Sequence, residues 1–170
     1  MRPKLELIEG EKVTELRFRR KLFDEAHEIQ WYLDVSFANG FKYELGKLVY
    51  AARGHHFEII EFDIEINEKF ARTGVSIVLA AKALEDNPQT LRIDSALIVD
   101  NKAAYMNAIY HHRMHPVDAV KETPAYKMRR YLGYELDPGE STLPNHPNEK
   151  SIIRMNTYRL DVREEDTVAK

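Results

Sequence analysis

Residues 56–66 read HFEIIEFDIEI, residues 67–74 read NEKFARTG, and residues 75–84 read VSIVLAAKAL. A second strand-like segment, LRIDSALIV, follows at 91–99. Two apolar strands joined by an apolar helix form a β-α-β unit. Gly74 at the helix entry leaves free N–H groups at the positive end of the helix dipole, where phosphate binds well. This stretch therefore predicts an α/β domain with an anion site at its centre.

The composition is typical of a soluble globular chain. The 170 residues are 44% hydrophobic and 31% charged, which fits one domain at 1–162 followed by a charged tail at 163–170. The net charge of −3 argues against a protein that coats nucleic acid. The absence of cysteine excludes disulfides, thiolate metal sites and thiol nucleophiles. With no apolar leader and no stretch as long as a membrane span, we expect a cytoplasmic location without membrane contact.

The segments that precede the central stretch favour one short strand and two helices. The strand is expected at 4–8. Apolar residues then follow helical spacing from 11 to 26, and a second helical segment is predicted at 28–38. The Asn-Gly pair at 39–40 ends this second segment.

Two strand-like pieces lie around Gly46 in 41–52, and the better one, at 47–52, is expected to pair with the strand at 57–66 as a hairpin. Apolar residues alternate along 57–66, but the adjacent Ile59 and Ile60 interrupt the alternation once. Because strand side chains alternate between faces, this pair indicates either a β-bulge or burial on both faces.

The remaining elements follow from the same patterns. The helix at 75–84 is apolar nearly all round, so we expect cover on both of its sides, and Asp100 or Asn101 is expected to cap the helix that ends near Tyr110. The later elements are a helix at 125–132, a strand that begins at 134, an exposed loop at 137–150 and a strand at 151–162.

This order of elements resembles that of the GNAT superfamily of acyl-CoA N-acyltransferases. Residues 66–76 are similar to that family's pyrophosphate-binding segment, with Phe70, Gly74 and Val75 at matching positions and Arg72 in place of a loop glycine. The NKAA sequence at 101–104 resembles the family's asparagine-containing helix entry. The YLGY sequence at 131–134 resembles its glycine–aromatic turn.

The resemblance implies an α/β (α+β) fold with a mixed, mainly antiparallel central sheet flanked by helices. It also implies acetyl-CoA or another acyl-CoA as co-substrate and an amine as acceptor. The cofactor-binding residues that it implies are Ile64, Ile66, Arg72, Thr73, Gly74, Val75, Ser76 and Asn101.

Acyl transfer to an amine requires a base, donors for the developing oxyanion and an acid for the leaving thiolate. Four carboxylates lie on the predicted central strand, namely Glu58, Glu61, Asp63 and Glu65. In the resembling family a glutamate on this strand often acts as base, and Glu61 is the candidate here because it follows the predicted bulge. Tyr110 is the candidate general acid. For each of these two residues, a solvent-facing or packing role is the alternative.

Three other interpretations compete with the enzyme. The first is a catalytically inactive GNAT-fold interaction protein, which Arg72 favours because a side chain there obstructs the approach of pyrophosphate to the backbone. The second is nucleic-acid binding through basic patches at 17–21, 111–113 and 129–130, which the net charge does not favour. The third is a metal site at His111 and His115, which we do not predict, because no glutamate accompanies them and Pro116 follows at once. A homodimer stays open.

Overall fold

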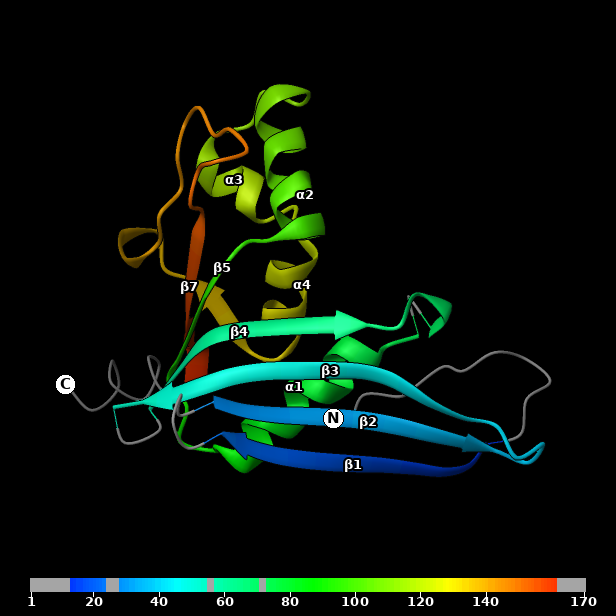
Figure 1. The fold of residues 1–170 in the computed structure, drawn as a ribbon. Coiled ribbons are helices and arrows are strands. Elements are labelled where there is room, and N and C mark those ends of the chain that lie inside the picture. The colour runs from blue at the N-terminus through cyan, green and yellow to red at the C-terminus, as the bar shows by residue number, and fades with distance from the viewer. Residues whose placement is uncertain (1–12, 24–27, 55–56, 71–72, 162–170) are drawn as a thin grey trace.

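The computed structural model describes residues 13–23, 28–54, 57–70 and 73–161. Within them one sheet has seven strands and is flanked by helices (Figure 1). In sheet order the strands are β1 (Val13–Phe23), β2 (Glu28–Phe37), β3 (Lys42–Arg53), β4 (Glu58–Ile66), β5 (Arg92–Ala96), β7 (Arg154–Arg159) and β6 (Tyr134–Leu136). The helices are α1 (Val75–Asp86), α2 (Val99–Tyr110), α3 (Pro116–Val120) and α4 (Pro124–Tyr131), with short 3-10 turns η2 (Glu68–Phe70) and η3 (Pro138–Glu140).

The predicted β-α-β unit is confirmed. β4 and β5 are parallel neighbours joined through α1, and every other neighbouring pair of strands in the sheet is antiparallel. The predicted hairpin between β3 and β4 is also confirmed. The sheet is therefore mixed and mainly antiparallel, as expected. The strand expected at 4–8 and the tail at 163–170 lie outside the described residues.

The prediction of helices at 11–26 and 28–38 is wrong, because these segments form the antiparallel strands β1 and β2. In β2 every second residue from Ile29 to Phe37 is buried, which is the period of a strand. In β1 the four-residue spacing of Phe18 and Leu22 fits a helix face and one strand face equally well. Pairing with β2 decides in favour of the strand.

Helix α1 packs on one face of the sheet, against β2, β3 and β4. Its buried residues Val75, Leu79, Ala80 and Ala83 form one stripe, whereas Ile77 and Val78 are only half-buried. The cover that was expected on both sides of α1 is therefore only partial on the side away from the sheet. A second core of buried residues gathers around Tyr105, where α2 and α3 pack together beyond β5 and β7 (Figure 1).

Strand β4 has a β-bulge opposite β3 and stops pairing with β5 before its own end. The register of β3 and β4 shifts between Val49 and Ala51, opposite Glu61, whose φ of 53° lies in the left-handed region. This is a β-bulge, which resolves the open interpretation of the Ile59–Ile60 pair. The pairing of β4 with β5 ends at Ile60 and Asp94, although β4 continues to Ile66. The two parallel strands therefore part at their C-terminal ends.

The loop at 137–150 was expected to be exposed, and most of it is, but α2 holds it in place. Tyr105 Oη donates to the carbonyl oxygen of Pro144 over 2.8 Å. Lys102 Nζ donates to the carbonyl oxygens of Glu149 and Ser151 over 2.6 and 2.8 Å. These contacts make the loop part of the second core.

Candidate functional site

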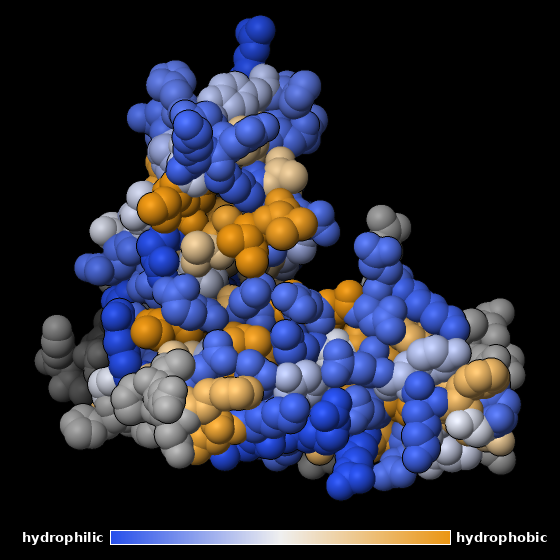
Figure 2. Space-filling view, in the orientation of Figure 1, coloured by the Kyte–Doolittle hydropathy of each residue, from blue (hydrophilic) through white to orange (hydrophobic). Residues whose placement is uncertain are grey.

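A slot of about 550 Å³ occupies the space where β4 and β5 part. Side chains from β4, from the end of β5, and from the N-terminal ends of α1, α2 and α4 line it. One wall is apolar and includes Ile64 and Leu97, whereas Ser76, Asn101 and Arg129 supply polar groups. Figure 2 shows that hydrophobic surface faces the hollow between the helical part and the sheet. A long ligand with an apolar arm and a polar end fits such a lining.

The N-terminus of α1 forms one end of the slot. Gly74 is its N-cap with φ at 86°, and among the described residues no side chain caps the helix or places a negative charge in its first turn. The first N–H groups of a helix have no acceptor within it. Val75 is buried, whereas Ser76 is half-buried and lines the slot. This end can therefore accept an anion on backbone N–H groups.

The structure brings most of the predicted cofactor-binding residues to the slot. Ile64, Ile66, Ser76 and Asn101 line it, and Gly74 and Val75 form the helix entry beside it. Thr73 lies next to this entry, where its hydroxyl donates to the carbonyl oxygen of Phe70 over 2.5 Å. Arg72 lies outside the described residues.

Asn101 does not cap its own helix, and neither does Asp100. The N-cap of α2 is Ile98, so the expected cap is wrong. Asn101 Oδ1 instead accepts from the backbone N–H of Ala125 over 2.8 Å. The side chain therefore ties the start of α2 to the start of α4 across one wall of the slot.

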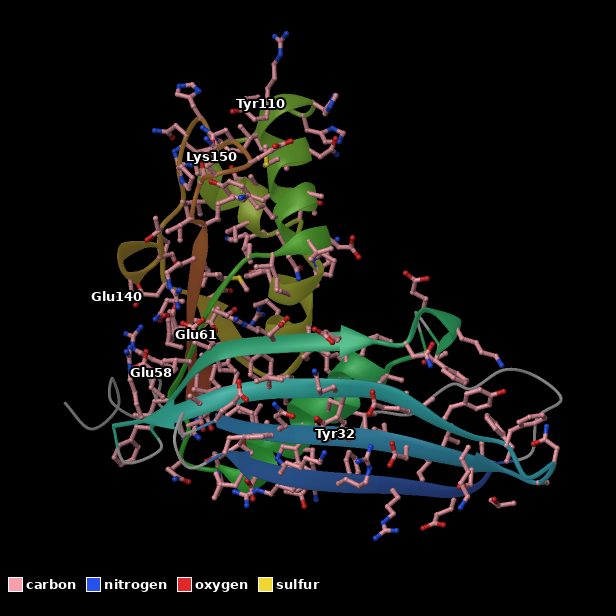
Figure 3. The ribbon with its side chains drawn as sticks, viewed as in Figure 1. Tyr32, Glu58, Glu61, Tyr110, Glu140 and Lys150 are labelled. Carbon is pink, nitrogen blue, oxygen red and sulfur yellow. The ribbon has the colours of Figure 1, made fainter. Side chains whose placement is uncertain are left out.

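The two candidate catalytic residues do not line the slot. Glu61 Oε1 accepts from Arg154 Nη2 over 2.9 Å, and the side chain of Glu61 is 62% exposed. Tyr110 lies at the far end of α2, where its hydroxyl donates to the carbonyl oxygen of Pro147 over 2.5 Å (Figure 3). Figure 3 shows Glu61 and Tyr110 well apart from each other.

Asp63 is the β4 carboxylate that does line the slot. It is half-buried, and desolvation raises the pKa of its carboxyl, with the nearby Glu65 charge raising it further. A carboxylate with a raised pKa is a better proton acceptor near neutral pH. Asp63 was one of four equivalent strand carboxylates in the sequence, and only the parting of the strands distinguishes it.

Arg129 is a slot residue that the sequence indicated only as part of a basic patch. It lines the slot and is 1% exposed. Its Nη1 donates to the carbonyl oxygens of Ile93 and Met155 over 3.0 and 2.9 Å, and its Nη2 donates to Ser95 Oγ. Burial lowers the pKa of the guanidinium to about 9. The sequence offers only an Arg-Arg pair on a short helix, which is ordinarily a solvated face.

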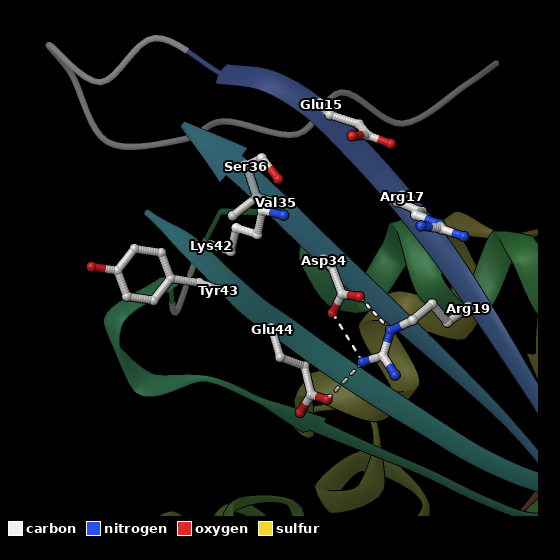
Figure 4. A pocket seen from close by; sticks show the side chains of 9 residues that line it. All are labelled: Glu15, Arg17, Arg19, Asp34, Val35, Ser36, Lys42, Tyr43 and Glu44. Carbon is white, nitrogen blue, oxygen red and sulfur yellow. Dashed lines mark hydrogen bonds and ion pairs between the residues drawn. The ribbon is translucent and has the colours of Figure 1, made fainter. Parts of the chain in front are cut away.

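A second, shallower pocket of about 400 Å³ lies over β1, β2 and β3 (Figure 4). Its central charges satisfy one another, since Arg19 pairs with Asp34 and with Glu44. Because these central charges are already matched and partly exposed, they do not require a ligand.

Two classes of site receive no support from the described residues. No group of three His, Asp or Glu side chains among them is arranged to hold a metal ion. His115 caps α3, where its Nδ1 accepts from the N–H of Val117 over 3.3 Å. No described helix is long and apolar enough to cross a membrane.

The site is thus framed by a mixed sheet whose two parallel strands part beside the N-terminus of α1. No protein-family model matches the sequence, and no curated protein matches it. Solved structures do match. A spermidine N-acetyltransferase SpeG chimera from Vibrio cholerae and the human enzyme superposes with a TM-score of 0.50 at 12% identity, over 85% of this chain and 73% of that one.

Two further solved structures match with comparable TM-scores and sequence identities. A GNAT-family acetyltransferase from Streptococcus pneumoniae gives a TM-score of 0.44 at 14% identity, over 77% of this chain and 66% of that one. A Bacillus subtilis acetyltransferase solved with CoA gives 0.46 at 11% identity, over 86% of this chain and 100% of that one. The superposition at a TM-score of 0.50, together with the mixed seven-stranded sheet, shows that this chain has the GNAT fold.

Proposed function

We propose that this protein is an acyl-CoA-dependent N-acyltransferase, acetyltransferase-like, that acts on an amine. The observation that carries the proposal is the slot between β4 and β5, which ends at the uncapped N-terminus of α1. The slot joins an anion-binding end to an apolar arm and a half-buried carboxylate. Acyl-CoA has the matching sequence of groups, namely pyrophosphate, pantetheine and thioester.

The pyrophosphate would lie over the N–H groups at the start of α1. Gly74 leaves room for the phosphates, and Val75 and Ser76 supply N–H donors. A helix N-terminus stabilises an exposed anion by about 0.3–1 kcal/mol. A hydrogen bond to a charged group contributes about 1.5–3 kcal/mol. The pantetheine arm would follow Ile66 and Ile64 toward the point where the strands separate.

Asp63 is the preferred base for the incoming amine. Its carboxylate lines the slot, and its raised pKa suits proton transfer near neutral pH. Glu61 remains the alternative base on the same strand. Glu61 ranks second because it lies outside the slot and its carboxylate is paired with Arg154.

The second candidate function is an interaction protein with a GNAT fold and no catalysis. One observation favours it, because neither Glu61 nor Tyr110 lines the slot. This candidate predicts no transfer and no affinity for CoA. A measurement of CoA binding therefore distinguishes the two candidate functions.

Calorimetric titration with acetyl-CoA, followed by release of CoA thiol in the presence of amines, tests the proposal. The most informative variant is Ser76→Glu. An acidic residue in the first turn stabilises a helix, so the fold should be kept. Like charges about 4 Å apart repel by about 4 kcal/mol near a protein surface, so affinity should fall tenfold or more.

Thr142→Glu is the matched control, because it adds the same charge at an exposed position away from the slot. The proposal expects micromolar affinity for acetyl-CoA in the wild type and in Thr142→Glu, with weaker binding in Ser76→Glu. Equal affinity in all three proteins would rule out the α1 site, and no binding at millimolar acetyl-CoA would leave the interaction protein as the better account.

A further inference from the structure

Arg129 is a buried cation that no carboxylate neutralises. Among the described residues, no acidic side chain forms an ion pair with it, and its Nε has no hydrogen-bond partner. Asp94, the acid whose charge acts on it, is already paired with Arg154 over 3.0 Å. Removing a charge from water without a counter-ion is strongly unfavourable. Such a group is retained for a structural link or for an anion that binds nearby.

The hydrogen bond from Arg129 to Ser95 favours the second role, an anion that binds nearby, because it leads from the buried cation to the slot. Arg129 Nη2 donates to Ser95 Oγ, and the serine is 5% exposed and lines the slot. A hydroxyl that accepts from a cation keeps its own proton for another acceptor. Among the described residues that proton has no acceptor, and the polarising cation makes the hydroxyl a stronger donor.

Ser95 also lies where the strands part, which is where the reactive end of a bound thioester would reach. The last residues paired between β4 and β5 are Ile60 and Asp94, so Ser95 is the first β5 residue beyond the point where the strands part. The apolar arm of a ligand that starts at α1 would end here. Asp63, the preferred base, lines the same slot from β4.

We propose that Ser95, held and polarised by the buried guanidinium of Arg129, donates a hydrogen bond to the thiolate that leaves when an acyl thioester is cleaved in the slot. This inference rests on the proposed function. The amine nitrogen forms the new C–N bond, and the C–S bond breaks with its electron pair on sulfur. The amine proton passes to Asp63 and then to solvent, from which the thiolate is finally protonated.

The roles of the two residues differ. Ser95 is the catalytic residue, since its hydroxyl touches the sulfur. Arg129 is a positioning residue, since it acts through Ser95. Tyr110, the general acid expected from the sequence, is not required, because the hydrogen bond from Ser95, whose hydroxyl Arg129 polarises, stabilises the thiolate.

The test compares CoA with desulfo-CoA, which lacks the sulfur, in the full chain. A thiol has an ordinary pKa of about 8.5. If Ser95 and Arg129 favour the thiolate, the pKa of bound CoA falls by about one unit, and affinity for CoA relative to desulfo-CoA rises between about pH 6 and about pH 8. The carboxylates of Asp63, Glu68 and Asp100 also line the slot. They act on the phosphates of both ligands alike, and because they are present in both the wild type and Ser95→Ala, the comparison of these two proteins isolates the effect of the serine hydroxyl on the sulfur.

The decisive variant is Ser95→Ala, which should abolish the pH-dependent preference for CoA and leave desulfo-CoA affinity unchanged. Thr90→Val is the matched control, since it removes an equally buried hydroxyl outside the slot and should keep the preference. Arg129→Lys should reduce the preference, and Ser95→Ala carries the test if that variant does not fold.

Three results would overturn the inference. If CoA and desulfo-CoA bind the wild type with equal affinity at about pH 6 and at about pH 8, the thiolate inference is refuted, whereas the proposed function still stands. A preference that survives Ser95→Ala would do the same. Failure of the wild type to bind either compound at millimolar concentration would refute the proposed function, and the thiolate inference with it.

Discussion

Replacing Gly74 by valine should weaken acetyl-CoA binding about tenfold or more. Gly74 has φ at 86°, in the left-handed region where a residue with a Cβ is strained by about 1–2 kcal/mol. Relief of that strain moves the turn, and with it the N–H groups of Val75 and Ser76. Loss of one hydrogen bond to phosphate costs about 1.5–3 kcal/mol, which corresponds to about 10- to 150-fold in affinity.

The assay is calorimetric titration of acetyl-CoA, with urea unfolding to measure stability separately. Gly40→Val is the matched control, because Gly40 has φ at 89° in an exposed turn with open space around its Cβ position. Both variants should lose similar stability, but only Gly74→Val should lose affinity. If the two variants bind acetyl-CoA equally well, the reasoning about the start of α1 is refuted.

Three further outcomes are expected. Asp63→Asn should reduce the rate of acyl transfer at least 100-fold, whereas Glu61→Gln should have little effect, and equal losses in both variants would contradict this assignment. Because the pKa of Asp63 is raised, the wild-type rate should already fall at a pH above the ordinary range of aspartate titration. Tyr105→Phe should lower the free energy of unfolding by about 0.5–1.5 kcal/mol. Because burial raises the pKa of Tyr105 to about 12, the contribution of its hydroxyl to stability should hold below about pH 10 and be lost between about pH 10 and pH 12, which urea unfolding at several pH values would measure. Lys102→Ala should speed proteolytic cleavage in the loop after β6, and an unchanged cleavage rate would mean that its bonds do not hold the loop.

The central part of the fold could be predicted from the sequence because local signals and tertiary structure agree there. The alternation in 57–66, the glycine at 74 and the apolar segment at 75–84 each indicate an element that forms. The doubled Ile59–Ile60 indicated a local irregularity, and the bulge lies at the next residue, Glu61.

The first two strands could not be predicted because their sequences fit both periods. Phe18 and Leu22 lie on one face of a helix and also on one face of a strand. In β2 the alternation from Ile29 to Phe37 is regular, but Trp31 and Val35 at a spacing of four fit a helix as well. The antiparallel pairing of β2 with β1 and with β3 selects the strand.

The site was predictable where it depends on backbone shape and unpredictable where it depends on packing. The helix entry at Gly74 and the strand residues Ile64 and Ile66 follow from the order of elements. The burial of Arg129 depends on α4 packing over β5 and β7, which nothing in an Arg-Arg pair indicates. The parting of the strands likewise decides which β4 carboxylate faces the slot.

The most direct test of the central claim is a map of backbone amide shifts in the nuclear magnetic resonance spectrum as CoA is added to the full chain. The account predicts that the largest shifts fall at Gly74, Val75 and Ser76 and extend along β4 to Ile64, with little change at the pocket over β1 to β3. Shifts centred on that second pocket, or no shifts at millimolar CoA, would contradict it.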